Sequence, residues 1–593
     1  MDRHNPSIAQ TAQRPDALPL SEETPTQKLD RLVQTAAAPL AGNLSPIALG
    51  LAVADWAWHL AASPGRQMEL AALATQLARD TLSMQDATTH GTGTQDDDPR
   101  FRAEEWARWP FSQWRAGFRN AETFWREAAQ VPGVSGHHTQ MIDFFARQYL
   151  GMLTPANGLL TNPVVLQETL QTGGRRLLQG AANWVSDMTG VPTAEDEANA
   201  ARFVVGGNVA ATPGEVVMRN SLIELIRYAP QTDTVHPEPV LIVPSWIMKY
   251  YILDLSPENS MVRYLVSQGH TVYMLSWRNP DEQDRDLRLD DYLHQGVLAA
   301  LRGAADDART DSVHAMGYCL GGTLLAIAAA AMSRTEGVPG EAGLPSLKTL
   351  TLLAAQVDFS EPGELGLFID EGQVNLLGHI TRGQGFLSGK QMAGSFQFLH
   401  SRDLVWTRQM REYLMGEREQ GNDLMAWNAD TTRLPARMHH EYLVALYLQN
   451  ALANGRYRVG GRPVSLNDLR LPIFAVGTER DHVSPWRSVY KLHRLTDAEI
   501  TFVLTSGGHN AGIISKPGHP RRHYRLAVRP DRAPWLSASE WLQTAPQYES
   551  SWWPAWQHWL AEHSSDPVKA KPIPASRSLG AAPGAYVMQR YGE

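Results

Sequence analysis

The sequence predicts an α/β fold, with a mostly parallel sheet and helices on both faces, preceded by a largely helical N-terminal domain. Short continuous apolar runs, beginning at Val240, alternate with helical segments, which is typical of strands buried on both faces. One such strand leads through a glycine-flanked turn into an Ala-rich helix within residues 312–330. Residues 27–230 show mainly helical spacing instead. We therefore divide the chain into a helical domain at 27–230 and an α/β domain at 231–593.

Composition limits the classes of function. A chain of 593 residues is long enough for several domains, and its 43% hydrophobic and 19% charged residues are typical of globular proteins. The net charge of −9 gives no reason to propose a nucleic-acid partner. One cysteine excludes a disulfide framework and a thiolate metal cluster, and no histidine spacing resembles a closed metal site. We expect neither a metal nor a cofactor.

The N-terminus carries no recognisable targeting signal. Residues 1–26 are polar and contain proline, without the apolar segment of a secretory signal, so we expect a disordered start of a cytoplasmic protein. The most apolar early run, 47–62, is interrupted by Asp55 and His59 and is too short to span a bilayer. The sequence therefore predicts a bundle helix there and no transmembrane segment.

The helical domain is divided by polar and breaking residues. Helical spacing covers 27–84, and a Thr-, Gly- and Asp-rich stretch at 86–98 predicts an exposed linker. A long helix is expected at 138–153, and Asn162-Pro163 and Gly173-Gly174 then break the chain into short helices.

The α/β domain follows in regular alternation. Apolar runs predict strands that begin at Val240 and extend over 271–277, the residues before Cys319, 349–354, 471–476 and 500–504. Helices are expected at 259–268 and 290–302, between the early strands. Right-handed crossovers of this kind place helices on both faces of a parallel sheet.

The alternation lapses between residues 358 and 447. Glycines, aromatic residues and amphipathic helical pieces replace it, which predicts a cap over the site, with a simple structural elaboration as the alternative. Trp406, Met425 and Trp427 are candidates to line a path through the cap, although core packing explains such residues equally well.

The turn at Cys319 has the form of a nucleophile elbow, which predicts that the α/β domain has an α/β-hydrolase fold. Gly317 and Gly321 lie two residues before and after it, and Gly322 follows, as a sharp strand-to-helix turn requires. The thiol would lie at a helix N-terminus, where the helix dipole favours the thiolate. A lone cysteine is often only a small buried residue. The strand, the paired glycines and the helix together favour a nucleophile.

The rest of a catalytic triad is expected on loops after late strands. In α/β-hydrolases the nucleophile comes first, the acid second and the histidine last. Asp481 follows the strand at 471–476, and His509 follows the strand at 500–504 between glycine-containing segments. Glu479 is an alternative acid and His482 an alternative base.

An oxyanion hole should accompany the elbow. Its first donor is the backbone N–H of Leu320, directly after the nucleophile, and its second comes from the loop after Val243. Trp246 and Ile247 are both candidates for that second donor.

Several motifs together resemble one known family. They are Gly-Tyr-Cys319-Leu-Gly-Gly, Lys249-Tyr-Tyr-Ile-Leu-Asp254-Leu, Ser276-Trp-Arg-Asn-Pro280, Asp481-His-Val-Ser-Pro-Trp486 and Ser551-Trp-Trp-Pro554. On these residues the chain resembles the poly(3-hydroxyalkanoate) synthases over about four fifths of its length, and its size is similar to that of the single-chain class I and II enzymes. The segment after His509 departs from the usual family pattern, which bears on substrate chain length and subclass.

The resemblance implies a reaction and partners. It implies that Cys319 is acylated by (R)-3-hydroxyacyl-CoA, that His509 is the general base and that Asp481 is its partner. Coenzyme A would then be part of the substrate and a product, and the polyester chain and its granule surface would be partners. The family also implies a homodimer and a cytoplasmic, granule-associated protein, with the helical domain involved in granule contacts.

The chemistry of a cysteine agrees with acyl transfer. Attack of a thiolate on an acyl-CoA exchanges one thioester for another, so the acyl group stays activated. A cysteine-dependent thioesterase or depolymerase of the same fold is the alternative function, and a non-catalytic granule protein is a third. Lys249 or Arg278 are candidates to meet the phosphates of coenzyme A, with surface solvation as the alternative.

Overall fold

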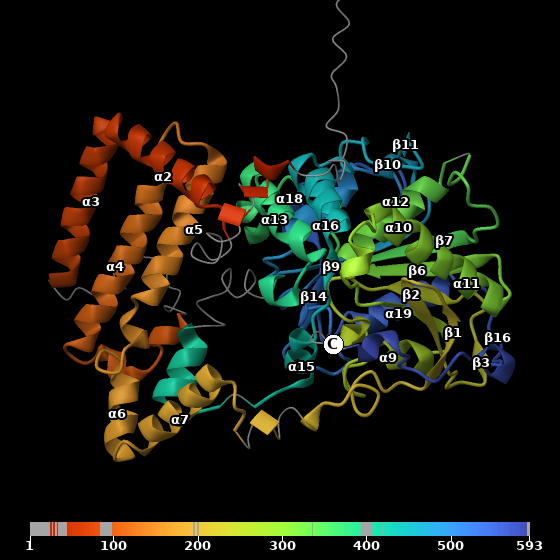
Figure 1. Cartoon of the computed structure of the whole chain (residues 1–593), viewed down its shortest axis with the longest axis horizontal. Coiled ribbons are helices and arrows are strands. Elements are labelled where there is room, and N and C mark those ends of the chain that lie inside the picture. The colour runs from red at the N-terminus through yellow and green to blue at the C-terminus, as the bar shows by residue number, and fades with distance from the viewer. Residues whose placement is uncertain are drawn as a thin grey trace, which may run out of the picture.

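A computed structural model gives the structure of the chain. It describes residues 24–26, 28–29, 32–33, 44–82, 98–193, 196–197, 201–334, 336–392, 406–418 and 420–589. The predicted disordered start and the predicted linker at 86–98 lie almost entirely outside these residues. Figure 1 shows a helical unit, which carries α2 to α7, beside a larger α/β domain.

The helical unit begins and ends its helices with conventional caps. Its helices are α2 Pro46–Ala61, α3 Pro64–Leu82, α4 Phe111–Ala129, α5 Gly136–Met152, α6 Pro163–Gln171 and α7 Arg175–Thr189. Asn162 caps α6 by accepting from the N–H groups of Val164 and Val165, and left-handed glycines at 174 and 190 flank α7. Among the described residues, no helix has the length and apolar character needed to cross a membrane.

Asp98 is part of the folded unit and not of a linker. Its carboxylate is buried and lies 2.7 Å from Arg100, and Arg119 reaches the same carboxylate. It also caps the short turn Pro99–Phe101. The polar composition of 86–98 therefore misled the prediction at this last position, because the partners of Asp98 are supplied by tertiary structure.

Ten strands form one mixed sheet. They are β1 Gly214–Arg219, β2 Ile223–Tyr228, β4 Val240–Val243, β5 Val272–Trp277, β6 Ser312–Tyr318, β7 Ser346–Leu353, β12 Ile473–Thr478, β13 Ile500–Thr505, β14 His523–Arg529 and β15 Gln547–Glu549. The order is β1-β2-β5-β4-β6-β7-β12-β13-β14-β15. Pairing is parallel from β5 to β13 and antiparallel at both margins. The six central strands match the predicted ones.

Within the described residues, three two-stranded ribbons lie outside this sheet. They pair β3 Thr234–Val235 with β16 Val568–Lys569, β8 Phe386–Leu387 with β9 Leu434–Pro435, and β10 Arg458–Val459 with β11 Arg462–Pro463.

The sheet begins earlier than the predicted domain boundary. Because β1 and β2 are its first two strands, the sheet begins before the predicted boundary at residue 231. Strand β2 is fully buried but contains Glu224 and Arg227, which break its apolar pattern. Arg227 pairs with Asp307, and Glu224 accepts from the N–H of Tyr586, so distant residues compensate both charges.

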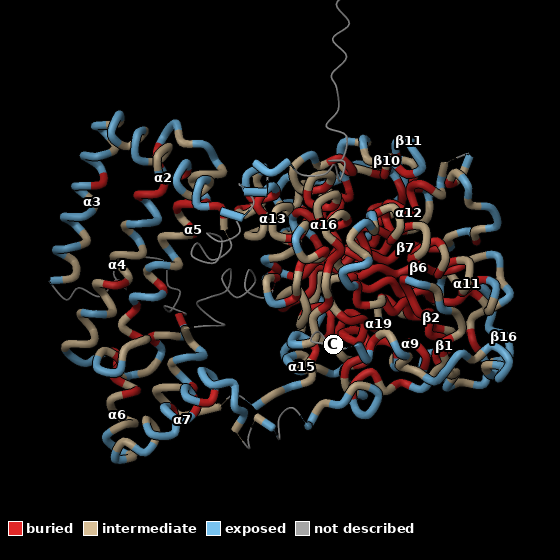
Figure 2. Tube along the Cα trace, in the orientation of Figure 1, coloured by how far each residue is buried: buried red, intermediate tan, exposed pale blue. Residues whose placement is uncertain are grey.

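Helices cover both faces of the sheet, which creates two cores. On one face pack α11 Ala299–Ala308, α12 Leu320–Met332, α17 Trp486–Tyr490 and α18 Ala538–Thr544; on the other pack α9 Met261–Ser267 and α19 Trp553–Glu562. Strand residues alternate between the two cores, as in β4, where Leu241 and Val243 face one and Val240 and Ile242 the other. Figure 2 shows the buried residues concentrated in this domain. The predicted helix at 290–302 is α10 Leu289–Asp291, a π-helical stretch Tyr292–Leu298 and α11.

Helical pieces between β7 and β12 form the predicted cap region. They are η9 Glu364–Phe368, α13 Glu371–Gln384, η11 Met410–Leu414, α15 Asp423–Ala429, α16 Ala436–Tyr442 and η12 Leu443–Leu448. The helical unit docks on this region through Arg418. This arginine pairs with Asp187 of α7 and with Glu412 of η11. The Asn183 side chain of α7 also donates to the carbonyl of Glu412.

Candidate active site

Cys319 lies at the tip of a strained turn between β6 and α12. Its backbone has φ 53° and ψ −128°, and its N–H donates to the carbonyl of Leu353 at 2.8 Å, which extends the β6–β7 pairing. A positive φ in a non-glycine residue costs about 1–3 kcal/mol and is typical of functional turns. A Cβ on Gly321 would collide with the carbonyl oxygens of Val243 and Pro244. The glycine is therefore required by the close approach of helix and loop.

Asp481 is held by several donors. Its side chain is fully buried, and Oδ1 accepts from the N–H groups of Val483 and Ser484 at 2.9 and 2.7 Å. Oδ2 accepts from the Thr478 hydroxyl and lies 2.8 Å from Nδ1 of His509. These bonds fix the position and orientation of the carboxylate.

His509 links the acid to the nucleophile. Its Nδ1 lies 2.8 Å from Asp481, and its side chain lies close to the Cys319 sulfur. Burial alone would lower the pKa of the imidazole, but the Asp481 carboxylate and the Cys319 sulfur outweigh it and raise that pKa well above its ordinary value. The raised pKa makes His509 a strong base beside the Cys319 sulfur, which is the arrangement needed to activate a cysteine nucleophile.

The two alternative site residues are engaged elsewhere. Glu479 lies 3.1 Å from Nε2 of His523, so the acid that reaches His509 is Asp481. His482 is exposed, and its carbonyl accepts from the N–H of Glu364 at the start of the cap.

The predicted oxyanion donors differ in availability. Leu320 is the first residue of α12, and its N–H has no hydrogen-bond partner among the described residues. Within the same residues, the N–H of Trp246 is also unpartnered, whereas that of Ile247 donates to the Ser245 hydroxyl at 3.3 Å. Trp246 is therefore the better candidate for the second donor.

Two tyrosine contacts near the triad escaped the sequence analysis. The Tyr318 hydroxyl donates to the Asn510 side chain at 2.6 Å, which ties the elbow to the loop of His509. The Tyr442 hydroxyl donates to that of Tyr447 at 3.2 Å, and burial followed by mutual interaction and the nearby Cys319 sulfur raises the pKa of Tyr442. The cap thus brings phenol groups to the nucleophile, and no local pattern signals this.

Several residues proposed for ligand contacts have structural roles. Lys249 is buried, and its ammonium donates to the carbonyl of Val587 at 2.6 Å. Arg278 pairs with Asp284 and donates to the carbonyl of Ser221. The Trp427 indole donates to the carbonyl of Lys249 and is buried in the core. Lys249 and Arg278 are therefore engaged within the protein, which does not favour the suggested phosphate contacts.

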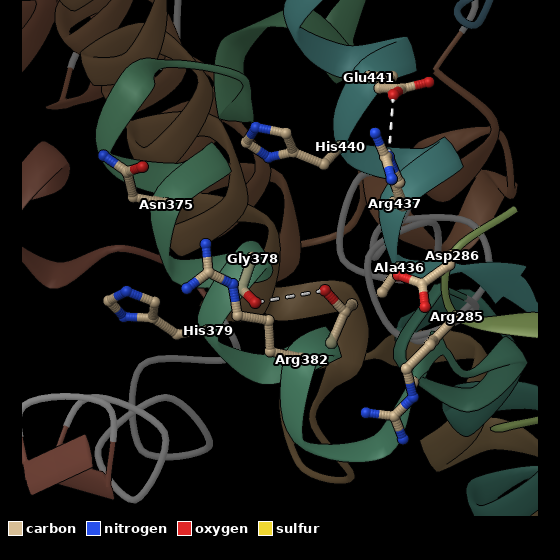
Figure 3. A pocket seen from close by; sticks show the side chains of 12 residues that line it. Arg285, Asp286, Asn375, Gly378, His379, Arg382, Ala436, Arg437, His440 and Glu441 are labelled. Carbon is tan, nitrogen blue, oxygen red and sulfur yellow. Dashed lines mark hydrogen bonds and ion pairs between the residues drawn. The ribbon is translucent and has the colours of Figure 1, made fainter. Parts of the chain in front are cut away.

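A pocket lined partly by charged side chains lies beside α13 and α16 (Figure 3). It is a small cavity of about 80 Å³ between α13 and α16. Arg285, Arg382 and Arg437 line it together with Asp286 and Glu441, and Arg437 pairs with Glu441. Among the described residues, no group of three or more His, Cys, Asp and Glu side chains is arranged to hold a metal ion.

Curated relatives match most of the chain. It is 38% identical to a poly(3-hydroxyalkanoate) polymerase of Methylorubrum extorquens over 77% of its own length and 75% of that protein. It is 36% identical to the poly(3-hydroxyalkanoate) polymerase subunit PhaC of Cupriavidus necator over 78% of both chains. The chain belongs to the poly(3-hydroxyalkanoate) polymerase family. The expected resemblance is thereby confirmed.

Family matches cover both parts of this polymerase family member. "Poly-beta-hydroxybutyrate polymerase (PhaC) N-terminus" matches residues 97–265, "Poly-beta-hydroxybutyrate polymerase N terminal" matches 24–66, and "alpha/beta hydrolase fold" matches 238–515. Among solved structures, the chain is similar to the monoacylglycerol lipase of Paleococcus ferrophilus, at 13% identity and a TM-score of 0.33, over 57% of this chain and all of that one. The predicted α/β-hydrolase fold is confirmed by the family match and the sheet.

Proposed function

We propose that the protein polymerises (R)-3-hydroxyacyl groups from coenzyme A thioesters into a polyester and releases coenzyme A, with Cys319 as the acylated nucleophile. The observation that carries this proposal is the Cys319–His509–Asp481 arrangement in a chain of the polymerase family. A cysteine keeps the acyl group activated as a thioester, which suits transfer to another hydroxyl.

Acylation begins with Cys319. His509 takes the thiol proton, and the sulfur attacks the thioester carbonyl to form a tetrahedral oxyanion. The N–H groups of Leu320 and Trp246 are the proposed donors to that oxygen. The carbon–sulfur bond to coenzyme A then breaks, and the proton on His509 passes to the leaving thiolate.

Elongation uses the same base in the second step. His509 removes the proton from a hydroxyl of a second hydroxyacyl group or chain end, and the oxygen attacks the Cys319 thioester. An oxyester forms, the carbon–sulfur bond breaks, and the proton returns to the cysteine sulfur. Asp481 orients His509 and stabilises its charged form in both steps.

Water competes with the hydroxyl in the second step. The proposed task of the cap is to admit the hydroxyacyl chain and to exclude bulk solvent. Buried aromatic groups beside the nucleophile support this task, since Tyr442 is 4% exposed and lies close to Cys319.

The helical unit is the proposed contact with the polyester granule, and we also propose a homodimer. Large apolar side chains are exposed on this unit, among them Trp58, Trp109, Leu170 and Leu178, each more than 70% exposed. Exposed apolar groups of this kind favour an apolar surface such as a polyester.

Thiol release and product analysis test the function. Purified protein is incubated with (R)-3-hydroxybutyryl-CoA, and free thiol and acyl product are measured beside Cys319→Ala. We expect thiol release with insoluble polyester, both abolished by the substitution. Release of free hydroxy acid without polyester would contradict the proposal and favour the alternative function, a cysteine-dependent thioesterase or depolymerase.

A further inference from the structure

Four cationic side chains gather on the loops that carry the catalytic acid and base. Arg480 directly precedes Asp481, and Lys516, Arg521 and Arg522 follow His509 in the segment before β14. The loops extend from the carboxyl ends of β12 and β13, so the cluster lies on the same edge of the sheet as the triad.

Two of these residues contact the same short segment, residues 506–507. The N–H of Arg480 donates to the carbonyl of Gly507 at 2.9 Å, and Nη1 of Arg522 donates to the carbonyl of Ser506 at 3.1 Å. A Cβ on Gly507 would lie 2.6 Å from that same Nη1. Gly507 is two residues from His509, and so no more than about 7.6 Å from it along the Cα trace.

Two other members of the cluster, Arg480 and Arg521, lie near Arg522. Burial lowers the pKa of the Arg522 guanidinium, and the positive charges of Arg480 and Arg521 lower it further. Burial likewise lowers the pKa of His519, with added repulsion from Arg522, Arg521 and Lys516. These neighbours repel one another, so the cluster favours a bound anion.

The cations lack acidic partners. In the described part of the chain, Arg480, Lys516, Arg521 and Arg522 form no ion pair with a carboxylate, and the nearby Glu479 is paired with His523. The Nε of Arg522 is buried and has no hydrogen-bond partner within those residues. By contrast, the arginines of the pocket in Figure 3 share it with Asp286 and Glu441.

We propose that the cluster of Arg480, Lys516, Arg521 and Arg522 binds the phosphate groups of the coenzyme A moiety. This inference rests on the proposed function, because it adds a subsite to the same substrate. Coenzyme A carries a pyrophosphate and a 3′-phosphate, and guanidinium groups bind phosphate oxygens through paired hydrogen bonds. Anchored there, the pantetheine arm extends past His509 toward Cys319.

The test compares two thioesters that differ only in the phosphate-bearing part. The rate of thiol release is measured with (R)-3-hydroxybutyryl-CoA and with the (R)-3-hydroxybutyryl thioester of pantetheine. The double variant Lys516→Gln/Arg521→Gln should lower kcat/KM for the coenzyme A thioester, relative to that for the pantetheine thioester, ~10-fold. The change should come chiefly from a higher KM for the coenzyme A thioester. Both side chains project from a partly exposed loop, so the variant is expected to fold.

Arg470→Gln is the matched control. It removes an exposed positive charge just before β12, at the amino ends of the parallel strands and so away from the triad loops. It should leave the ratio unchanged. An unchanged ratio in the double variant would overturn the inference, and so would a comparable fall caused by Arg285→Gln in the pocket of Figure 3.

Direct binding separates this inference from the proposed function. The Kd of free coenzyme A, measured by titration calorimetry, should rise ~10-fold in the double variant even if no thioester is turned over. Absence of thiol release from either thioester in the wild type would contradict the proposed function. An equal Kd for wild type and double variant would contradict the phosphate site.

Discussion

Nδ1 of His509 lies 2.8 Å from Oδ2 of Asp481, although 28 residues separate them in sequence. The carboxylate is fully buried, whereas the histidine side chain remains 14% exposed. This difference matters because the acid is fixed by the protein while the base keeps access to the side where Cys319 and an incoming hydroxyl meet.

Asp481→Asn should slow thiol release strongly. The carboxylate is the largest influence that raises the pKa of His509 against burial, so its removal lowers that pKa and misorients the ring. We expect a loss of about 10³–10⁴ in kcat. Because the base must be neutral to accept a proton, the acidic limb of the rate profile should move to lower pH.

Glu479→Gln is the matched control for that change. It removes a carboxylate from the same loop, but one that pairs with His523. An equal loss of rate in Glu479→Gln would contradict the assignment of Asp481 as the partner of His509.

Gly321→Ala should disable the elbow. The added Cβ meets the carbonyl oxygens of Val243 and Pro244, which belong to backbone and cannot rotate away. We expect a lower midpoint of thermal unfolding and loss of thiol release. Gly65→Ala is the control, because Gly65 lies near the start of α3 with open space around it; it should change neither the unfolding midpoint nor thiol release. Normal activity in Gly321→Ala would contradict the prediction, because it would show that the turn can accommodate a Cβ.

Arg418→Met should loosen the helical unit from the cap. The Arg418 side chain is 5% exposed and pairs with Asp187, Asp196 and the buried Glu412. Loss of a buried partner costs about 3 kcal/mol, to be measured as a lower free energy of unfolding in urea. Arg147→Met removes an exposed pair with Asp143 and should cost less than about 1 kcal/mol. Equal costs would refute the special role of Arg418.

Acid should destabilise the fold partly through His493. This residue is 2% exposed, and burial followed by the charge of Arg529 lowers its pKa to about 3. Below the ordinary histidine pKa, the unfolded chain binds a proton that the native imidazole does not, so stability falls as pH falls from about 6.5 toward 3. At pH 5 the loss attributable to His493 is about 2 kcal/mol.

His493→Leu should reduce that sensitivity. Unfolding in urea at pH 7 and pH 5 measures it, and the difference between the two pH values should shrink by about 2 kcal/mol in the variant. The same difference in both proteins would show that other groups control the acid response.

The central strands and the order of the triad were predictable because they leave local signals. A strand buried on both faces must be apolar, and an elbow such as Gly317-Tyr-Cys319-Leu-Gly321 needs glycines at fixed spacing. Asp481 and His509 then follow from the order of strands, since parallel strands bring their carboxyl ends to one edge.

The strands at the margins of the sheet were not predictable, because they leave no such local signal. Strand β14 carries arginines, and Arg529 is accommodated by the carbonyls of His493, Thr496 and Ala498. Such compensation comes from residues about 30 positions away, so the local pattern resembles an exposed loop. The Tyr442–Tyr447 pair likewise depends on how the cap folds back over Cys319, which no spacing encodes.

Mass spectrometry of the Cys319 peptide tests the central claim most directly. The protein is mixed with limiting (R)-3-hydroxybutyryl-CoA, quenched in acid and digested. The account predicts a ladder of adducts on Cys319, spaced by one hydroxyacyl unit and removed by hydroxylamine as expected for a thioester. An unmodified Cys319 peptide from protein that is forming polymer, or a ladder attached to another residue, would contradict it.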